Sequence, residues 1–211
     1  MPIFDPNSKV MMFLSDVLDY VKLGLMVVLY SIPVITLGAA ITAGMTIAMK
    51  IERKEAPVIA KPFRKAFREN FRQALPLTIG FELLFALLAF DWYQVMQMER
   101  TTAVKLATAG LVLAVLLLIM IGFYVFAGMA RYELGAKALI KNAVIYTILN
   151  FPKNLLAMGI LVAGILLYAY LKEVVPIVIC AIPAVELFYM GKVCVQTFNR
   201  FEQAGESEPE Q

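Results

Sequence analysis

Residues 104–130 read VKLATAGLVLAVLLLIMIGFYVFAGMA, an apolar run in which Lys105 is the only charged side chain. As a helix, this run is about 40 Å long at 1.5 Å per residue, more than the ~30 Å of hydrocarbon in a bilayer. Similar runs recur along the 211-residue chain, which is 61% apolar and 17% charged. Soluble domains have ~45–50% apolar and ~25% charged residues, so the composition indicates a membrane protein.

The apolar runs predict an all-α fold, a polytopic transmembrane helix bundle with six spans in one domain over residues 1–201. A single helix from Asp16 to Met49 would be about 50 Å long, and Pro33 disfavours helix at Ile32. We therefore divide this stretch into a helical hairpin; a single kinked helix is the alternative and gives five spans. The six predicted spans cover about residues 12–32, 34–51, 74–96, 104–130, 153–171 and 174–198.

Small residues follow one face of the second predicted span. Ala39 and Ala43 are four residues apart, as are Ala40 and Gly44, so each pair shares a side of the helix. Such stripes let two helices approach closely. We therefore expect this span to pack tightly against its neighbours.

Basic residues gather between the second and third predicted spans. Loops rich in Lys and Arg stay on the cytoplasmic side, whereas the loops on the opposite side carry only Arg100, Lys105 and Lys172. Six spans then place both termini in the cytoplasm, and the acidic tail at residues 202–211 is expected to be disordered. The cytoplasmic connection carries eight of the nineteen basic residues: Lys50, Arg53, Lys54, Lys61, Arg64, Lys65, Arg68 and Arg72.

Part of this connection, about residues 58–73, is predicted to form an amphipathic elbow helix. Its phenyl rings recur every four residues and its cations project from the other side, as in helices that lie in the membrane interface. Two interpretations stay open: contact with anionic lipid of the inner leaflet, or docking of a cytoplasmic partner. Nucleic acid is not expected, because apolar spans flank the segment. The contact residues we assign are Phe63, Arg64, Lys65, Phe67, Arg68, Phe71 and Arg72.

A second elbow helix is predicted at about residues 133–150. The sequence NFPKNL at residues 150–155 resembles NFRQAL at residues 70–75, and each leads into an apolar span. The similarity suggests two units of helix, elbow and helix in the same orientation, as in parallel membrane-protein repeats.

Two carboxyl groups fall near the centres of predicted spans, those of Glu82 and Glu186. A charge at this depth costs at least ~2.5 kcal/mol, so each group should be protonated, paired or exposed to a watery cavity. Two interpretations stay open. The two groups belong to a proton or solute site, or they are neutral carboxyls that hydrogen bond between helices. Asp91 and the pair Arg131 and Glu133 lie near helix ends, where interfacial positions are expected.

The residues that enzymes commonly use are scarce. The chain has no histidine, which excludes His-based triads and shuttles, and it has no phosphate-binding glycine motif. We therefore expect no catalytic residue, cofactor or metal site, although a membrane protease or transferase could use Glu82 and Glu186. Cys180 and Cys194 lie ~21 Å apart on one predicted helix and are expected to be free thiols.

Several short motifs occur in a characteristic order: FDPNSK at residues 4–9, SIPVITLGA at 31–39, FRENFRQA at 67–74, ARYE at 130–133 and NFP at 150–152. Together they resemble the YesL family of bacterial membrane proteins, whose function is uncharacterised. Ala127 stands where a proline of the family is expected, and Glu82 and Glu186 match no family feature.

The resemblance implies a bacterial inner-membrane protein. Members are commonly encoded beside carbohydrate importers of the ATP-binding-cassette (ABC) kind, so we expect an accessory protein whose partners are the permease and ATPase subunits. A stand-alone small-solute transporter is the first alternative, with Glu82 and Glu186 lining one cavity between two similar halves. A scaffold or sensor that transports nothing is the second.

Overall fold

The computed structural model describes residues 9–55, 58–99, 101–170 and 175–206, and the regular structure within these ranges is helical. This confirms the predicted all-α class. The helices are α1 (Lys9–Tyr30), η2 (Val34–Thr36, a 3-10 turn), α2 (Leu37–Glu52), α3 (Ala60–Met96), α4 (Thr102–Met129), α5 (Ala136–Leu149), α6 (Phe151–Tyr170) and α7 (Val175–Glu206).

The chain breaks between α1 and α2 where the proline predicted it. Pro33 is extended, with φ −74° and ψ 109°, and η2 follows before α2 begins. The hydroxyl of Thr36 lies 2.5 Å from the Tyr30 carbonyl oxygen and 2.7 Å from that of Pro33, which occupies backbone acceptors at the turn. Residues 9–52 therefore form two helices that pack against each other, as a hairpin requires, and not one kinked helix; the choice between five and six spans stays a prediction.

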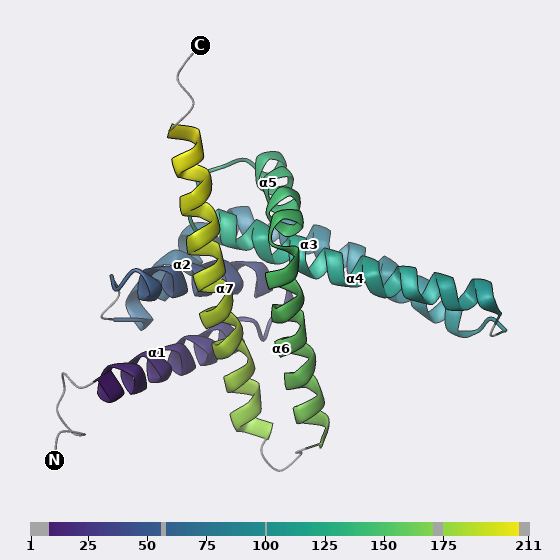
Figure 1. Ribbon diagram of the computed structural model, residues 1–211, viewed down its shortest axis with the longest axis horizontal. Helices are drawn as coiled ribbons and strands as arrows, with labels where there is room; N and C mark the ends of the chain where they lie inside the picture. Colours follow the sequence, from purple (N-terminus) through teal and green to yellow (C-terminus); the bar gives the residue numbers. More distant parts are fainter. Residues whose placement is uncertain (1–8, 56–57, 100, 171–174, 207–211) are drawn as a thin grey trace.

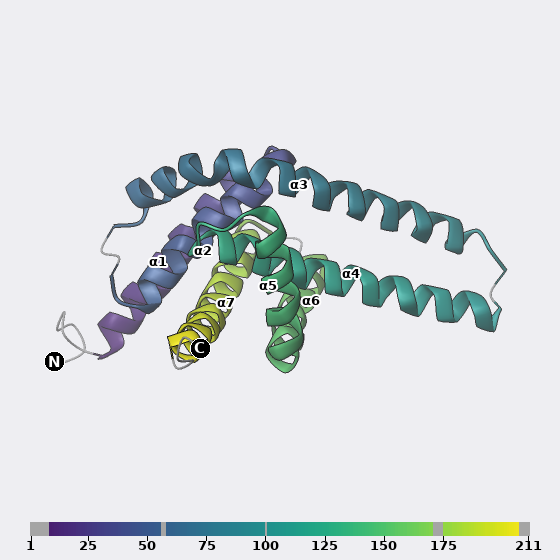
Figure 2. The same cartoon turned by 90° about the horizontal axis from the view of Figure 1, so that it is seen from above.

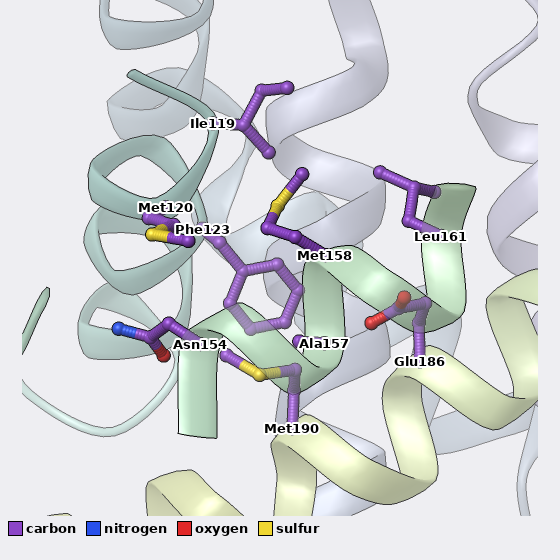
Figure 3. Close-up of a pocket in the computed structure, with 9 residues that line it drawn as sticks. All are labelled: Ile119, Met120, Phe123, Asn154, Ala157, Met158, Leu161, Glu186 and Met190. Atoms are coloured by element: carbon purple, nitrogen blue, oxygen red, sulfur yellow. The ribbon is translucent and has the colours of Figure 1, made fainter. Parts of the chain in front are cut away.

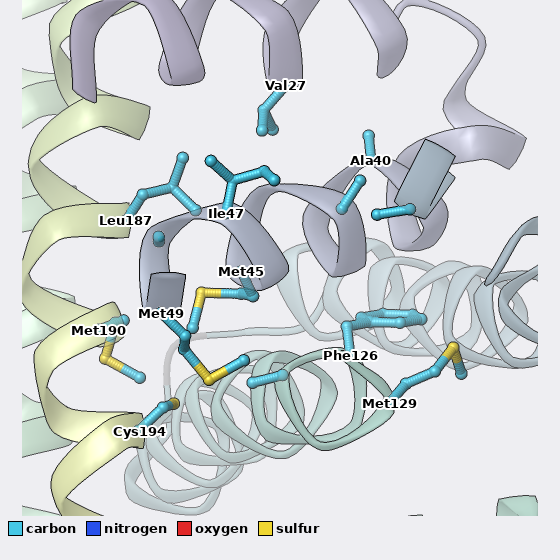
Figure 4. Close-up of a cluster of buried hydrophobic side chains, with 14 of the residues drawn as sticks. Val27, Ala40, Met45, Ile47, Met49, Phe126, Met129, Leu187, Met190 and Cys194 are labelled. Atoms are coloured by element: carbon cyan, nitrogen blue, oxygen red, sulfur yellow. The ribbon is translucent and has the colours of Figure 1, made fainter. Parts of the chain in front are cut away.

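Helix α2 lies at the centre of the molecule and packs against α1, α3, α4 and α7. A Cβ atom at Gly38 would overlap Thr78 and Phe126, and one at Gly44 would lie 2.6 Å from Val27 Cγ2. These glycines therefore permit the close approach that the small-residue stripe predicted. Figure 4 shows the larger α2 side chains, including Met45 and Met49, filling the space between the surrounding helices.

Helices α3 and α4 form a hairpin that projects well beyond the rest of the protein (Figures 1 and 2). The projecting part exposes large apolar side chains, among them Leu83, Leu87 and Leu106, which are 62%, 62% and 75% exposed. A surface of this kind is unfavourable in water and favourable in hydrocarbon. The hairpin is therefore suited to insertion in lipid.

Several helices are long and apolar enough to cross a membrane. Within the described ranges these are residues 34–52, α3 and α4, and a fourth is added if α5 and the first part of α6 count as one broken span. Six spans, and cytoplasmic termini, stay predictions.

Helices α5 and α6 meet at a bend of 90°. Beyond it, α6 packs beside α7, and both run steeply across the direction of the α3–α4 hairpin (Figure 1). Helix α7 also packs on α1, where Tyr20 and Phe188 meet edge to face with ring centroids 5.2 Å apart.

Two predicted boundaries are wrong. Helix α3 passes through residues 73 and 74 without a break, so the first predicted elbow is the beginning of a 37-residue helix and not a separate one. Helix α7 continues through Glu206, so residues 202–206 are helical and only residues 207–211 of the predicted tail lie outside the described part. The second elbow does form its own helix, α5.

Candidate functional site

The first half of α3 has one aromatic and one cationic side. Phe63 is fully buried, and its ring and that of Phe67 meet the ring of Tyr30 from α1, with centroids 5.2 and 4.9 Å apart. Phe71 packs against Phe67 with centroids 5.7 Å apart. The three phenyl rings therefore join α3 to the interior of the bundle.

This packing corrects one expectation from the sequence. The rings were expected in the acyl boundary of the membrane, but Phe63 contacts only protein and is inaccessible to lipid or a partner. A four-residue aromatic period shows which side of a helix is apolar; it does not say whether lipid or another helix covers that side.

The opposite side of α3 carries exposed cations, which we call the basic face: Lys61, Arg64, Lys65, Arg68 and Arg72. Of these, Lys65 lies 3.9 Å from Glu69, and both side chains are mostly exposed. Nearby, the end of α2 adds Arg53 and Lys54, also exposed. Arg53 lies 3.8 Å from Glu55, so this end of the protein keeps a large excess of positive charge.

Arg131 follows α4 and binds the end of α7. Its guanidinium makes two hydrogen bonds to the carboxylate of Glu202, at 2.7 and 3.0 Å, and a third to Asn199 at 2.7 Å. The hydroxyl of Tyr132 also donates to Glu202, at 2.9 Å. Burial alone would raise the pKa of Glu202, but the hydrogen bonds from Tyr132 and Arg131 outweigh it and the pKa is lowered.

The sequence analysis did not find this partner of Arg131. Glu202 stood in the segment predicted to be disordered, while Glu133, the acidic residue closest in sequence, is exposed in the connection before α5. Asp91 is exposed near the end of α3, and its interfacial position stays a prediction.

Buried amides hold the bend between α5 and α6. Asn154, which is 1% exposed, accepts a hydrogen bond from the Tyr124 hydroxyl at 2.9 Å and donates to the Thr147 carbonyl at 3.0 Å. Asn150 accepts from the Thr197 hydroxyl at 3.3 Å and donates to the Tyr146 carbonyl at 3.1 Å. These hydrogen bonds tie the bend to α4 and α7. In the sequence, the signal for such a bend was the pair of asparagines at the start of an apolar run.

The two carboxyls predicted inside the spans line separate cavities. Glu186 faces a cavity of about 130 Å³ between α4, α6 and α7, and Glu82 faces one of about 210 Å³ between α2, α3 and α4. Both cavities are lined by Ile119 and Phe123 of α4. Figure 3 shows the Glu186 carboxyl pointing toward the Phe123 ring.

Each carboxyl has one oxygen, Oε1, that is buried without a hydrogen-bond partner among the described residues. Neither forms an ion pair with a lysine or arginine of that part of the chain. The structure does not bring Glu82 and Glu186 into one cavity, which weighs against a single solute site between two halves.

Cys194 is buried as a free thiol, as predicted, and the side chain of Cys180 lies outside the described residues. Within the part described, no three or more Cys, Asp or Glu side chains gather in a way that could hold a metal ion.

The fold and these sites define an all-helical protein with several helices suited to crossing a membrane. Residues 20–92 match the protein-family model described as "Protein of unknown function, DUF624". The match covers less than half of the chain, includes the basic face and Glu82, and is consistent with the resemblance to the YesL family, which it does not name. No curated protein and no solved structure matches the chain.

Proposed function

We propose that the chain is a bacterial inner-membrane accessory protein of a carbohydrate ABC importer, and that the basic face of α3 is its cytoplasmic contact. The carbohydrate importer comes from the resemblance to the YesL family. The observation that supports a contact at this place is the exposure of the basic face on a helix whose aromatic side packs against the core.

The charge of the basic face is largely uncompensated. In the described part of the chain, its only ion pair joins Lys65 to Glu69, and such exposed pairs contribute at most ~1 kcal/mol. A cationic surface without internal partners attracts acidic surfaces and speeds their association. The permease and ATPase subunits are the partners that the proposal assigns to it.

The packing of α3 also keeps the basic face in place. The rings of Phe63 and Phe67 meet Tyr30, and Gln73 donates a hydrogen bond to the Leu134 carbonyl at 2.6 Å. A helix fixed in this way loses little conformational freedom when a partner binds. Arginines, with five donors in a planar fork, suit carboxylate partners in particular.

The test is copurification from native membranes in mild detergent, followed by mass spectrometry. The wild-type chain should recover a permease or ATPase subunit. Reversing four charges, with Arg64, Lys65, Arg68 and Arg72 each changed to Glu, should abolish recovery, because repulsion replaces attraction at the contact. Recovery of no importer subunit by the wild-type chain would refute the proposal.

The matched control reverses Lys137 and Lys141, which are exposed on α5, and should leave recovery unchanged. Because basic loops also set topology, Glu69→Cys should be labelled only from the cytoplasmic side in each variant. A second outcome would also refute the proposal: the wild-type chain recovers no importer subunit, and the fourfold reversal weakens binding to vesicles of phosphatidylglycerol. The basic face would then bind lipid and not a protein partner.

A further inference from the structure

Two helical stripes face each other across the cavity that contains Glu82. On α3 the stripe is Thr78, Phe81, Glu82 and Phe85, and on α4 it is Ile119, Gly122, Phe123 and Phe126. Both have the spacing i, i+3, i+4, i+7, which places four side chains on one side of a helix. Helix α2 lines another side of the cavity, where Gly38, without a side chain, leaves room for the Phe126 ring.

Four phenyl rings line this cavity, from Phe81 and Phe85 of α3 and from Phe123 and Phe126 of α4. The rings of Phe81 and Phe126 lie 5.9 Å apart between centroids and are tilted by 54°. The face of a phenyl ring carries negative electrostatic potential, and several rings around one space attract a cation. Cavities of this composition recognise ammonium groups that carry alkyl substituents.

The polar groups of the cavity provide one free acceptor. Oε1 of Glu82 is buried and has no hydrogen-bond partner within the described ranges. Among the described lining residues, the only other one with a side-chain oxygen is Thr78, whose hydroxyl donates to the Ala74 carbonyl at 2.8 Å. A carboxylate oxygen that is shielded from water is stabilised when a cation binds beside it, so a positively charged ligand would supply the partner that Oε1 of Glu82 lacks.

We propose that the cavity of Glu82 binds an organic ammonium ion, with the carboxylate of Glu82 as its counter-ion and the four phenyl rings around its alkyl groups. A volume of about 210 Å³ is below the ~300–1,000 Å³ of drug-sized sites, so the ligand is the size of a choline headgroup. This site goes beyond the importer contact and does not depend on it.

The cavity of Glu186 supplies an internal control. It also holds a buried carboxyl oxygen without a hydrogen-bond partner, but its volume is about 130 Å³ and, among the described side chains that line it, Phe123 is the only one with a phenyl ring. Figure 3 shows the thioethers of Met158 and Met190 around that ring instead of further aromatic rings. Since the described lining of the Glu186 cavity does not provide several phenyl rings around one space, the carboxyl of Glu186 should not contribute to ammonium binding.

Binding is measured by calorimetry on the purified full chain in detergent, with choline as the probe and 3,3-dimethylbutan-1-ol as its uncharged analogue. Choline should bind at least about tenfold more tightly than the alcohol, because only choline carries a charge. Glu82→Gln should weaken choline binding about tenfold or more. Phe81→Leu should weaken it about two- to thirtyfold.

Glu186→Gln is the matched variant and should bind choline as the wild type does. Equal binding of choline and the alcohol, unchanged binding by Glu82→Gln, or a larger loss in Glu186→Gln would each overturn the assignment. Thermal unfolding of Glu82→Gln verifies its fold, and Phe85→Leu provides a second aromatic variant if Phe81→Leu does not fold.

The ammonium group could belong to a lipid or to a free solute, and nanodiscs distinguish the two. If the apparent affinity for choline falls as phosphatidylethanolamine replaces phosphatidylglycerol, the amine of a lipid headgroup occupies the cavity. If the affinity does not change, the ligand is a free cation. Both results support the ammonium site, whereas no choline binding in detergent or in phosphatidylglycerol nanodiscs refutes it.

Discussion

Two segments of similar sequence follow different courses in this protein. NFRQAL at residues 70–75 lies inside the continuous helix α3, whereas NFPKNL at residues 150–155 lies at the 90° bend between α5 and α6. In both, the asparagine donates to the carbonyl four residues earlier: Asn70 to Ala66 at 2.9 Å and Asn150 to Tyr146 at 3.1 Å. The contact they share therefore does not decide whether the chain bends.

Proline alone does not decide whether the chain bends either. Pro152 has no N–H to donate to a carbonyl of α5 and disfavours helix at the residue before it, which favours a break. Yet Pro76 directly follows the first segment inside α3, and the helix continues with a gentle arch (Figure 2). A proline permits a break at either place, and the surroundings determine where one occurs.

Tertiary contacts distinguish the two places. At the bend, Asn154 binds Tyr124 of α4 and the Thr147 carbonyl, and Asn150 binds Thr197 of α7. Ala74 holds the position equivalent to Asn154 and is buried in the core, where it can make no side-chain hydrogen bond. The bend therefore has polar partners on two other helices, and the straight segment has none at that position.

The difference limits the predicted repeat. The first unit runs straight into the projecting hairpin, while the second turns, so that α5 lies on α4 and α6 lies beside α7. Two units with similar sequence at their start therefore do not have the same shape.

The largest effect is expected at Asn154. Asn154→Leu leaves the Tyr124 hydroxyl and the Thr147 carbonyl without their partner, and should lower the free energy of unfolding by roughly 1–3 kcal/mol. Chemical unfolding in detergent measures the loss. In a double-mutant cycle with Tyr124→Phe the two losses should be less than additive, and full additivity would show that this hydrogen bond does not hold the bend.

A smaller effect is expected on acidification, through the contact of Glu202 at the end of α7 with Arg131. Because the pKa of Glu202 is lowered in the folded protein, its stabilisation is complete above the usual value of 4.5 and is lost as pH falls through the lowered pKa. The side chain is 42% exposed, so the contribution is about 1 kcal/mol or less. Glu202→Gln should reduce the pH dependence of unfolding below pH 4.5, and an identical pH profile would contradict the assignment.

Replacing the proline at the bend should matter less than replacing its polar partners. Pro152 lies in the first turn of α6, where N–H groups have no helical acceptor, so Pro152→Ala should change the free energy of unfolding by less than about 1 kcal/mol. The 90° bend should persist. Spin labels at the exposed positions Ile140 and Val162 report it by pulsed electron paramagnetic resonance, and a lengthened distance would show that the proline makes the bend.

The smallest effect is expected at Asn70. Its amide bonds only to a carbonyl of its own helix and is partly exposed, so Asn70→Ala should cost at most about 0.5 kcal/mol. The same change at Asn150 also removes one of the two acceptors of the Thr197 hydroxyl, which keeps the Val193 carbonyl, and should cost more. Equal losses in thermal unfolding would erase the distinction between the two segments.

The sequence predicted the helices better than their joints. Within the described residues, each of the six predicted span segments lies mostly in a helix, because apolar runs and Pro33 are properties of the chain alone. The continuity of α3 was missed, because Pro76 and a change from basic to apolar residues resemble a boundary. The tail was predicted too early, because the reason for its order, the contact between Glu202 and Arg131, joins residues distant in sequence.

The same division applies to the candidate sites. Composition and periodicity by themselves determined that helices rich in apolar residues carry one cationic side and two isolated carboxyls. Only the tertiary structure decided that Phe63 faces protein, and that Glu82 and Glu186 enter different cavities on either side of Phe123. The physical reason is that a helical period fixes which residues share a side, while packing selects what covers that side.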